Sequence, residues 1–211
     1  AFGEWASARR DERLGTARSG QYLPPNLRMY SGAFDRLGAW EYEPPYGYVW
    51  YPAVDTQWRP YYDGYWVASS TYDWTWIGFE GFAWPTHHYG RWGLARSRWF
   101  WVPDRRWGPA WVEWATAPGY VSWCPLGFDN RPVTALSATA GNRWASWVVL
   151  PRTHFGLRSS YVAQHAVAPH HLPPATPFVA QASARAPLPR PAPVPPRHDA
   201  AVPGVWAQTP R

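Results

Sequence analysis

Residues 50–76 read WYPAVDTQWRPYYDGYWVASSTYDWTW, with tryptophan at positions 50, 58, 66 and 74. The spacing of eight recurs with two short phase shifts, at positions 76, 84 and 92 and then at positions 99 and 107. An interval of this length, interrupted by Pro and Gly, is typical of a strand followed by a turn. The sequence therefore predicts an all-β fold, a Trp-rich antiparallel β-meander built of repeats of about 25 residues.

Each repeat opens on alternating aromatic residues. In Trp74-Thr75-Trp76 and Trp99-Phe100-Trp101, the period of two places both tryptophans on the same face of a strand. Because Pro cannot donate to a central ladder, the prolines are expected at strand ends, edges or bulges. Gly64 and Gly90 are expected at turn positions with positive φ. Cross-strand pairs of Trp and Tyr would then be the main stabilising contacts of the sheet.

Composition divides the chain into three segments. Residues 1–38 are expected to form a short helix over 4–18, followed by turns and loops. Residues 39–156 form the predicted Trp-rich β-repeat domain, in which residues 144–151 supply one more strand that closes the sheet. Residues 157–211 are a Pro/Ala/Arg-rich arm, with 12 of the 25 prolines in the last 43 residues, and we expect residues 187–196 to be extended polyproline II.

The charge pattern argues against a nucleic-acid surface. The formal net charge of +6 comes from arginine alone, because the chain has no lysine. Residues 40–166 contain ten Arg against nine acids and are therefore nearly neutral, which does not favour a DNA-binding face there. Arginine interleaved with Trp and Tyr is expected to stack on aromatic rings instead.

We expect an exported protein, in the periplasm or at the cell surface. The chain starts at Ala1 without Met, which is what removal of a signal peptide leaves, although a partial chain would start in the same way. No uncharged apolar stretch approaches the length of a transmembrane helix. The single cysteine, Cys124, excludes an internal disulfide but does not argue against export.

A family resemblance is carried by six stretches: Tyr46-Gly47-Tyr48-Val49-Trp50, Trp58-Arg59-Pro60-Tyr61, Gly64-Tyr65-Trp66, His88-Tyr89-Gly90-Arg91-Trp92, Trp107-Gly108-Pro109-Ala110-Trp111-Val112 and Trp123-Cys124-Pro125-Leu126. On these motifs, residues 37–129 resemble a tryptophan-rich bacterial domain family of unknown function. Members of that family occur in exported proteins, some beside FecR-type regulatory modules. The sequence departs from the family pattern over residues 82–87 and at Ser122 and Cys124. The resemblance implies a β fold and an envelope location, and it implies no reaction.

We expect twelve motif residues to have a structural role: Trp50, Trp58, Trp66, Trp76, Trp84, His88, Arg91, Trp92, Trp101, Trp107, Trp111 and Trp123. Their rings are expected to be the core, because the repeats contain few aliphatic residues. The alternative is that exposed rows of Trp stack on sugar rings or single-stranded bases.

The sequence predicts that the protein is not an enzyme. It has no Walker A loop, dinucleotide fingerprint, nucleophile elbow or HExxH helix. Its carboxylates mostly adjoin turns, at Asp55, Asp63, Asp73, Glu80 and Asp104. His87 and His88 are expected on opposite faces of a strand, which disfavours a shared metal ion, and His88 is expected to bond a backbone group. Cys124 is expected to be a small buried hydrophobe. We therefore expect no metal, cofactor, small-molecule substrate or nucleic acid.

The favoured function is a structural or scaffolding subunit of the bacterial envelope, docked on other protein subunits of a membrane-associated assembly such as an electron-transport or light-harvesting complex. Peripheral contact with the membrane surface is part of this hypothesis. The arm would dock on partners through isolated apolar anchors, Leu188, Val194, Val202, Val205 and Trp206, because polyproline II loses little entropy on binding. The alternative function is a cell-wall polysaccharide-binding module with exposed Trp and Tyr.

Overall fold

The computed structural model describes residues 18–69, 71–135, 146–157, 161–168, 171–172 and 176–181. Except for Arg18, the helix expected over residues 4–18 lies outside these ranges. Turns and loops were expected up to residue 38, but the chain forms two 3-10 helices and an α-helix there: η1 (Arg18–Gln21), η2 (Pro25–Tyr30) and α2 (Ser31–Leu37). Leu27 and Phe34 are fully buried, so tertiary packing stabilises helices too short to be stable alone.

Eight strands form four successive β-hairpins, which are β1 (Gly38–Glu43) with β2 (Gly47–Pro52), β3 (Gly64–Ser69) with β4 (Asp73–Gly78), β5 (Tyr89–Ala95) with β6 (Arg98–Trp107), and β7 (Val112–Ala117) with β8 (Tyr120–Pro125). The hairpins begin at residues 38, 64, 89 and 112, at intervals of 26, 25 and 23 residues. The repeat has the length of one hairpin, although each repeat opens on the second strand of a hairpin, such as β4 or β6. The expected antiparallel all-β fold is confirmed.

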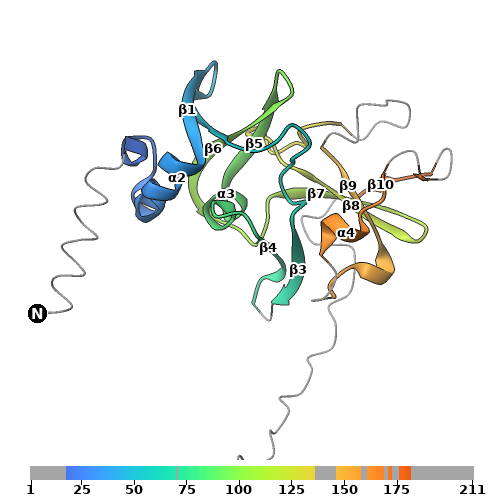
Figure 1. The fold of residues 1–211 in the computed structure, drawn as a ribbon. Helices are drawn as coiled ribbons and strands as arrows, with labels where there is room; N and C mark the ends of the chain where they lie inside the picture. The colour runs from blue at the N-terminus through green and yellow to red at the C-terminus, as the bar shows by residue number, and fades with distance from the viewer. Residues whose placement is uncertain are drawn as a thin grey trace, which may run out of the picture.

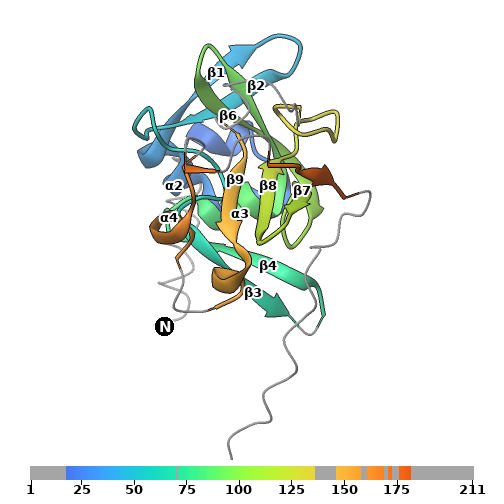
Figure 2. The ribbon, with the colours of Figure 1, turned by 90° about the vertical axis from the view of Figure 1, so that its right-hand side faces the viewer.

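The hairpins do not form one continuous meander. They belong to three sheets, with the strand orders β1-β2-β6-β5, β10-β7-β8-β9 and β3-β4, where β9 is Val148–Pro151 and β10 is Val179–Ala180. β2 pairs with β6 through Trp50 opposite Trp101, so the third hairpin lies beside the first. Figures 1 and 2 show β1–β2 at one end of the molecule and β3–β4 at the other. Spacing along the chain specifies each hairpin but does not specify which hairpins become neighbours.

Aromatic rings make up most of the core. The largest cluster includes Trp50, Trp66, Trp76, Trp92, Trp101 and Trp123, each at most 1% exposed. Trp66 alone lies within 5.5 Å, between ring centroids, of Trp76, Trp114 and Trp123. Trp74 with Trp76, and Trp99 with Trp101, are buried as the period-two pattern predicted. Because each ring removes a large apolar area from water, a few strand positions supply most of the burial.

Pro and Gly mark irregularities in the strands. Pro52, Pro125 and Pro151 end their strands, whereas Pro103 lies inside β6, where the pairing with β5 shifts register. Gly90 has φ of +72° as expected, but Gly64 does not have a positive φ. A Cβ at Gly64 would lie 2.2 Å from the carbonyl oxygen of Ile77, so close approach of the two strands explains the glycine there.

Residues 83–88 form a short helix, α3 (Ala83–His88), and not the expected strand. Pro85 is compatible with the helix because it lies in the first turn, where its missing N–H would have no helical partner. His87 and His88 are both buried. The expectation that they point to opposite faces of a strand is wrong, since these six residues show no hydrophobic period that could distinguish a helix from a strand.

The C-terminal part of the described chain extends the sheet that contains β7 and β8. β9 pairs with β8 as the expected closing strand and leads into η4 (Arg152–His154), α4 (Val162–His165) and β10. Val162 is 1% and Leu172 9% exposed, and the N–H of Gln181 donates to the Trp114 carbonyl at 2.8 Å. Contact with the domain thus continues past residue 157, where the arm was expected to begin. Among the described residues no helix has the length and apolarity needed to span a membrane.

Candidate functional site

The structure buries most of the twelve motif residues. Trp50, Trp66, Trp76, His88, Arg91, Trp92, Trp101 and Trp123 are buried, Trp58, Trp107 and Trp111 are partly buried, and Trp84 is exposed. The buried rings have no surface left for a sugar or a base to stack on. The five anchor residues expected in the arm, at positions 188, 194, 202, 205 and 206, lie outside the described residues.

His88 joins α3 to the end of β6. Its Nδ1 lies 2.8 Å from the carbonyl oxygen of Gly108. Its ring contacts those of Trp84 and Trp107, at 4.2 and 5.6 Å between centroids. Burial lowers the pKa of His88, so the ring is neutral at physiological pH and holds two segments of the fold together.

His87 is enclosed by Tyr61, which follows β2. The Tyr61 N–H donates to Nε2 of His87 at 3.2 Å, and the Tyr61 hydroxyl donates to the His87 carbonyl at 2.8 Å. The other ring nitrogen, Nδ1, lies 2.9 Å from the carbonyl oxygen of Ala83. Burial lowers the pKa of His87 to about 3. A ring that is neutral and fully engaged in this way does not fit the role of an acid or base near neutral pH.

Arg91 ties β5 to the loop that follows β8. Its guanidinium lies 3.6 Å from the centroid of the Trp111 ring, a cation–π contact. Nε and Nη2 donate to Oδ1 of Asn130 at 3.0 and 2.7 Å, and Nη1 donates to the Gly90 carbonyl at 2.8 Å. Because the side chain is 4% exposed, these contacts fix the loop around Asn130 against the core.

The remaining chemically interesting groups are dispersed. Glu80 accepts from Nε1 of Trp58 at 2.7 Å, and burial raises its pKa to about 6. Cys124 is fully buried, and burial raises the pKa of its thiol to about 12. In the described part of the chain, no three His, Cys, Asp or Glu side chains come together as metal ligands would.

One cavity brings exposed aromatic rings and carboxylates together. This aromatic cleft has a volume of about 370 Å³ and lies between the β1–β2 turn, the strands β5 and β6, and the loop after β8. Its lining residues are Glu43, Pro44, Pro45, Tyr46, Trp92, Gly93, Leu94, Ala95, Phe100, Val102, Gly127, Phe128, Asp129, Pro132 and Val133. The volume is within the range of small-molecule sites, about 300–1,000 Å³.

Tyr46 and Phe128 form the rims of the aromatic cleft. Their ring centroids are 6.0 Å apart, with the planes nearly perpendicular, and Tyr46 also lies 5.4 Å from the buried ring of Phe100. Tyr46 is 42% and Phe128 59% exposed. Two rings that are this exposed at the mouth of a cavity are available to contact a ligand.

The floor of the aromatic cleft exposes main-chain groups. β5 is the last strand of its sheet, and the N–H of Trp92 on its outer edge donates to the Leu126 carbonyl at 3.3 Å. Because hydrogen-bonding direction alternates along a strand, Leu94 presents its N–H and C=O on the same edge. No further strand pairs with this edge within the ranges that the structure describes.

Two carboxylates, those of Glu43 and Asp129, line the aromatic cleft. Glu43 accepts from the Tyr51 hydroxyl at 2.9 Å and from the exposed Arg96 at 2.6 Å. Asp129 accepts from the N–H of Arg131 at 3.0 Å, and among the described residues it takes part in no ion pair. The carboxylate of Asp129 is therefore available to a cationic ligand.

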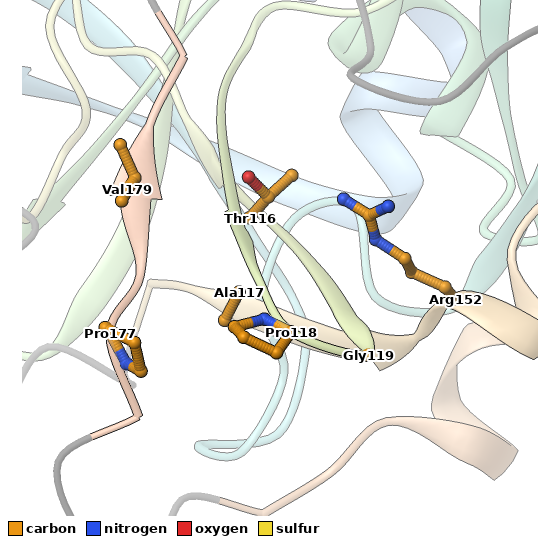
Figure 3. Close-up of a pocket in the computed structure, with 7 residues that line it drawn as sticks. All are labelled: Thr116, Ala117, Pro118, Gly119, Arg152, Pro177 and Val179. Carbon is orange, nitrogen blue, oxygen red and sulfur yellow. The ribbon is translucent and has the colours of Figure 1, made fainter.

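A second cavity lies under β10. It has a volume of about 430 Å³ and is lined by Thr116, Ala117, Pro118, Gly119, Arg152, Pro177 and Val179. Figure 3 shows Pro177 and Val179 on one side of the β7–β8 turn and Arg152 on the other. Its lining has no aromatic ring, and one wall is the chain's own C-terminal segment. The aromatic cleft is therefore the stronger candidate site.

Comparison with protein families shows what the domain is similar to. Residues 31–130, just under half of the chain, match a family of unknown function, DUF6600. Comparison with curated proteins and with solved structures finds no match. The matched region contains every lining residue of the aromatic cleft except Pro132 and Val133, and it ends before β9, α4 and β10 begin.

Sequence reasoning missed the aromatic cleft. Tyr46 was included only as part of a family motif, and Phe128 and Asp129 were not singled out. A signal was nevertheless present, because two loop segments each combine turn residues with one aromatic ring, Pro44-Pro45-Tyr46-Gly47 and Gly127-Phe128-Asp129-Asn130. An aromatic ring in a polar turn has no strand face to pack on and is a candidate for surface recognition.

Proposed function

We propose that this protein is a non-catalytic structural subunit of the bacterial envelope that docks, through the aromatic cleft, on an extended segment of a partner protein. The observation that carries the proposal is the combination of exposed aromatic rims, Tyr46 and Phe128, with an open strand edge at Leu94. Aromatic residues dominate the energetics of protein interfaces. A free strand edge can add an extended peptide by main-chain hydrogen bonds.

Preorganisation of the aromatic cleft supports the same role. Arg91 holds Asn130 against β5, and Phe100 packs under Tyr46. Less conformational entropy is lost on binding when the walls are already ordered. The buried, dispersed ionisable groups, His87, Glu80 and Cys124, favour a binding role over a catalytic one, since catalysis requires groups that converge on a reacting atom.

The proposed location and partner rest on the sequence. The resemblance to exported proteins favours the periplasm or the cell surface, and the partner would be a subunit of a larger membrane-associated assembly. Because the chain lacks lysine, ordinary amine-directed crosslinking would report poorly on this interface. A photoreactive residue placed in the aromatic cleft is the better probe.

The test is photocrosslinking in the native envelope with Phe128→p-benzoylphenylalanine. The matched control carries the same residue in place of Met29, which is 68% exposed and does not line the aromatic cleft. We expect one stoichiometric protein partner from position 128 and none from position 29. Equal crosslinking from both positions, or none from position 128, would contradict the proposal.

Polysaccharide binding is a second candidate, favoured by an aromatic strip on the other face of the first hairpin. Tyr22 lies 4.9 Å from Trp40 and 4.6 Å from Tyr48, and Tyr48 lies 5.6 Å from Tyr42, between ring centroids. Tyr42 is 65% and Tyr48 51% exposed. If this function is right, the wild-type protein is retained on peptidoglycan. The substitutions Tyr42→Ala and Tyr48→Ala weaken that retention. Wild-type protein that elutes without retention would exclude it.

A further inference from the structure

We infer that the aromatic cleft binds a segment of the same chain, the proline-rich residues 187–196, within one molecule. The inference rests on the docking site proposed above and names its ligand class, an extended proline-rich peptide that carries arginine. The segment reads PLPRPAPVPP and lies outside the described residues. Three observations on the described part of the chain lead to this assignment: the direction of the strand that precedes the segment, the reach of the intervening residues, and the chemistry of the lining.

The first observation is the direction of β10. It pairs antiparallel with β7, with Val179 opposite Thr116 and Ala180 opposite Ala115, and Gln181 then donates to Trp114. The chain therefore runs along β7 toward the residue where that strand begins, Val112. The aromatic cleft lies beyond that end, because the N–H of Leu126 donates to the Trp111 carbonyl at 2.9 Å and the next residue, Gly127, lines the cavity.

The second observation is reach. From the level of Trp114 to that of Trp111 the strand covers about 10 Å, and the two steps from β10 across β7 to Leu126 add about 10 Å sideways, a direct distance of about 14 Å. Five residues lie between Gln181 and Pro187, and the six steps of an extended chain span at most about 20 Å, at about 3.3–3.6 Å per residue. The proline-rich segment can therefore enter the aromatic cleft of its own molecule without displacing β10.

The third observation is the match of lining and segment. Proline-rich segments in polyproline II conformation dock in aromatic-lined grooves, and Tyr46, Phe100 and Phe128 supply such a groove. Residues 182–211 contain four Arg and one Asp, a formal charge of +3. Asp129 and Glu43 are the two acidic residues of the lining, so the cavity offers carboxylates to Arg190, the arginine within the segment.

The experiment uses the purified full chain with Phe128→p-benzoylphenylalanine, irradiated at low protein concentration and mapped by mass spectrometry. We expect a crosslink from position 128 to residues 185–197 in a product of monomer mass, with a yield that does not depend on protein concentration. The same photoreactive residue at Met29 should give no such product.

Charge reversal tests the role assigned to Arg190. The change Arg190→Glu should lower the crosslink yield about fivefold, the effect of about 1 kcal/mol for an exposed charge pair. The matched control, Arg211→Glu, changes the net charge of the chain equally and should leave the yield unchanged. Equal losses in both variants would show a general charge effect and would overturn the assignment of Arg190.

Each remaining outcome identifies which molecule, and which segment of it, occupies the aromatic cleft. A product of dimer mass whose yield rises with concentration would mean that a second copy donates the segment, and would overturn binding within one molecule. A crosslink confined to residues outside 185–197 would overturn the assignment of the ligand. If the purified chain gives the monomer product while the envelope yields no partner from position 128, the inference stands and the proposed docking on another protein fails.

Discussion

The buried cluster and the aromatic cleft use the same kinds of ring for different purposes. Trp101 is fully buried, pairs with Trp50 across two hairpins and donates from Nε1 to the Tyr89 carbonyl at 2.7 Å. Phe128 is 59% exposed, and its ring contacts the ring of Tyr46. A ring inside the cluster stabilises the fold, whereas a ring at the rim contributes little stability and remains available for binding. Aromatic content alone therefore does not locate a binding site.

The largest expected effect comes from removing a ring from the buried cluster. Trp101→Ala should lower the free energy of unfolding by about 3–5 kcal/mol, because it removes a large apolar area and leaves a cavity. Urea denaturation followed by circular dichroism measures this change. The control Trp84→Ala, at a ring that is 47% exposed, should cost no more than about 1 kcal/mol. Equal losses would show that the distinction between buried and exposed rings is wrong.

His87 tests whether the cluster depends on a neutral ring. Its folded pKa of about 3 lies below the ordinary histidine pKa of 6.5, so His87 stabilises the fold fully above pH 6.5 and loses that contribution as the pH falls toward 3. His87→Gln should cost about 1–3 kcal/mol at pH 7.5, since buried hydrogen bonds are imperfectly replaced. The cost should shrink at pH 4.5. Urea midpoints of both proteins at the two pH values provide the measurement, and a cost that grows on acidification would contradict this assignment.

Glu80 should have the opposite dependence on pH. Its folded pKa of about 6 lies above the ordinary glutamate pKa of 4.5, so the contribution of Glu80 to stability is complete below pH 4.5 and decreases as the pH rises through 6. Glu80→Gln keeps an acceptor for Trp58 and should gain up to about 2 kcal/mol relative to wild type between pH 4 and pH 8. Thermal melts of the variant and of the wild-type protein at both pH values measure this difference in stability. The exposed Glu41, which bonds Arg98 at 2.7 Å, is the control, and Glu41→Gln should change little.

The smallest effect on stability is expected at the rim. Phe128→Ala should change the free energy of unfolding by less than about 0.5 kcal/mol, because the ring is mostly solvated. The same change should abolish copurification with the proposed partner from the envelope. Calorimetry of the purified variant and quantitative mass spectrometry of the envelope preparation give the two values. A large loss of stability would mean that Phe128 belongs to the core.

Local structure could be predicted from the sequence to a considerable extent. The spacing of tryptophan, together with alternating pairs such as Trp74 and Trp76, indicated the strands, their antiparallel hairpins and the buried faces, since the period of two is a local property. The closing strand at Val148–Pro151 was found in the same way. The three-segment division of the chain stays a prediction.

Other features depended on contacts between distant residues. Nothing in the spacing indicates that β2 pairs with β6, or that Tyr46 and Phe128, which are far apart in the chain, meet across one cavity. Helix α3 was missed because its six residues are too few to show a period. The turn segments around Tyr46 and Phe128 carried a signal for surface recognition, but the cleft that unites them could not be predicted, because side-chain chemistry carries no information on the open edge of β5.

The pairing of Trp50 with Trp101 also limits how such a chain can evolve. In solenoid repeat proteins each unit touches only its neighbours, so units can be added or deleted. Here the first unit needs the third, and the second unit lies in a sheet of its own. Duplication of the second hairpin would therefore lengthen the loop that must close before Trp50 and Trp101 can meet. The tandem pattern in the sequence coexists with an architecture whose folding depends on contacts between remote segments.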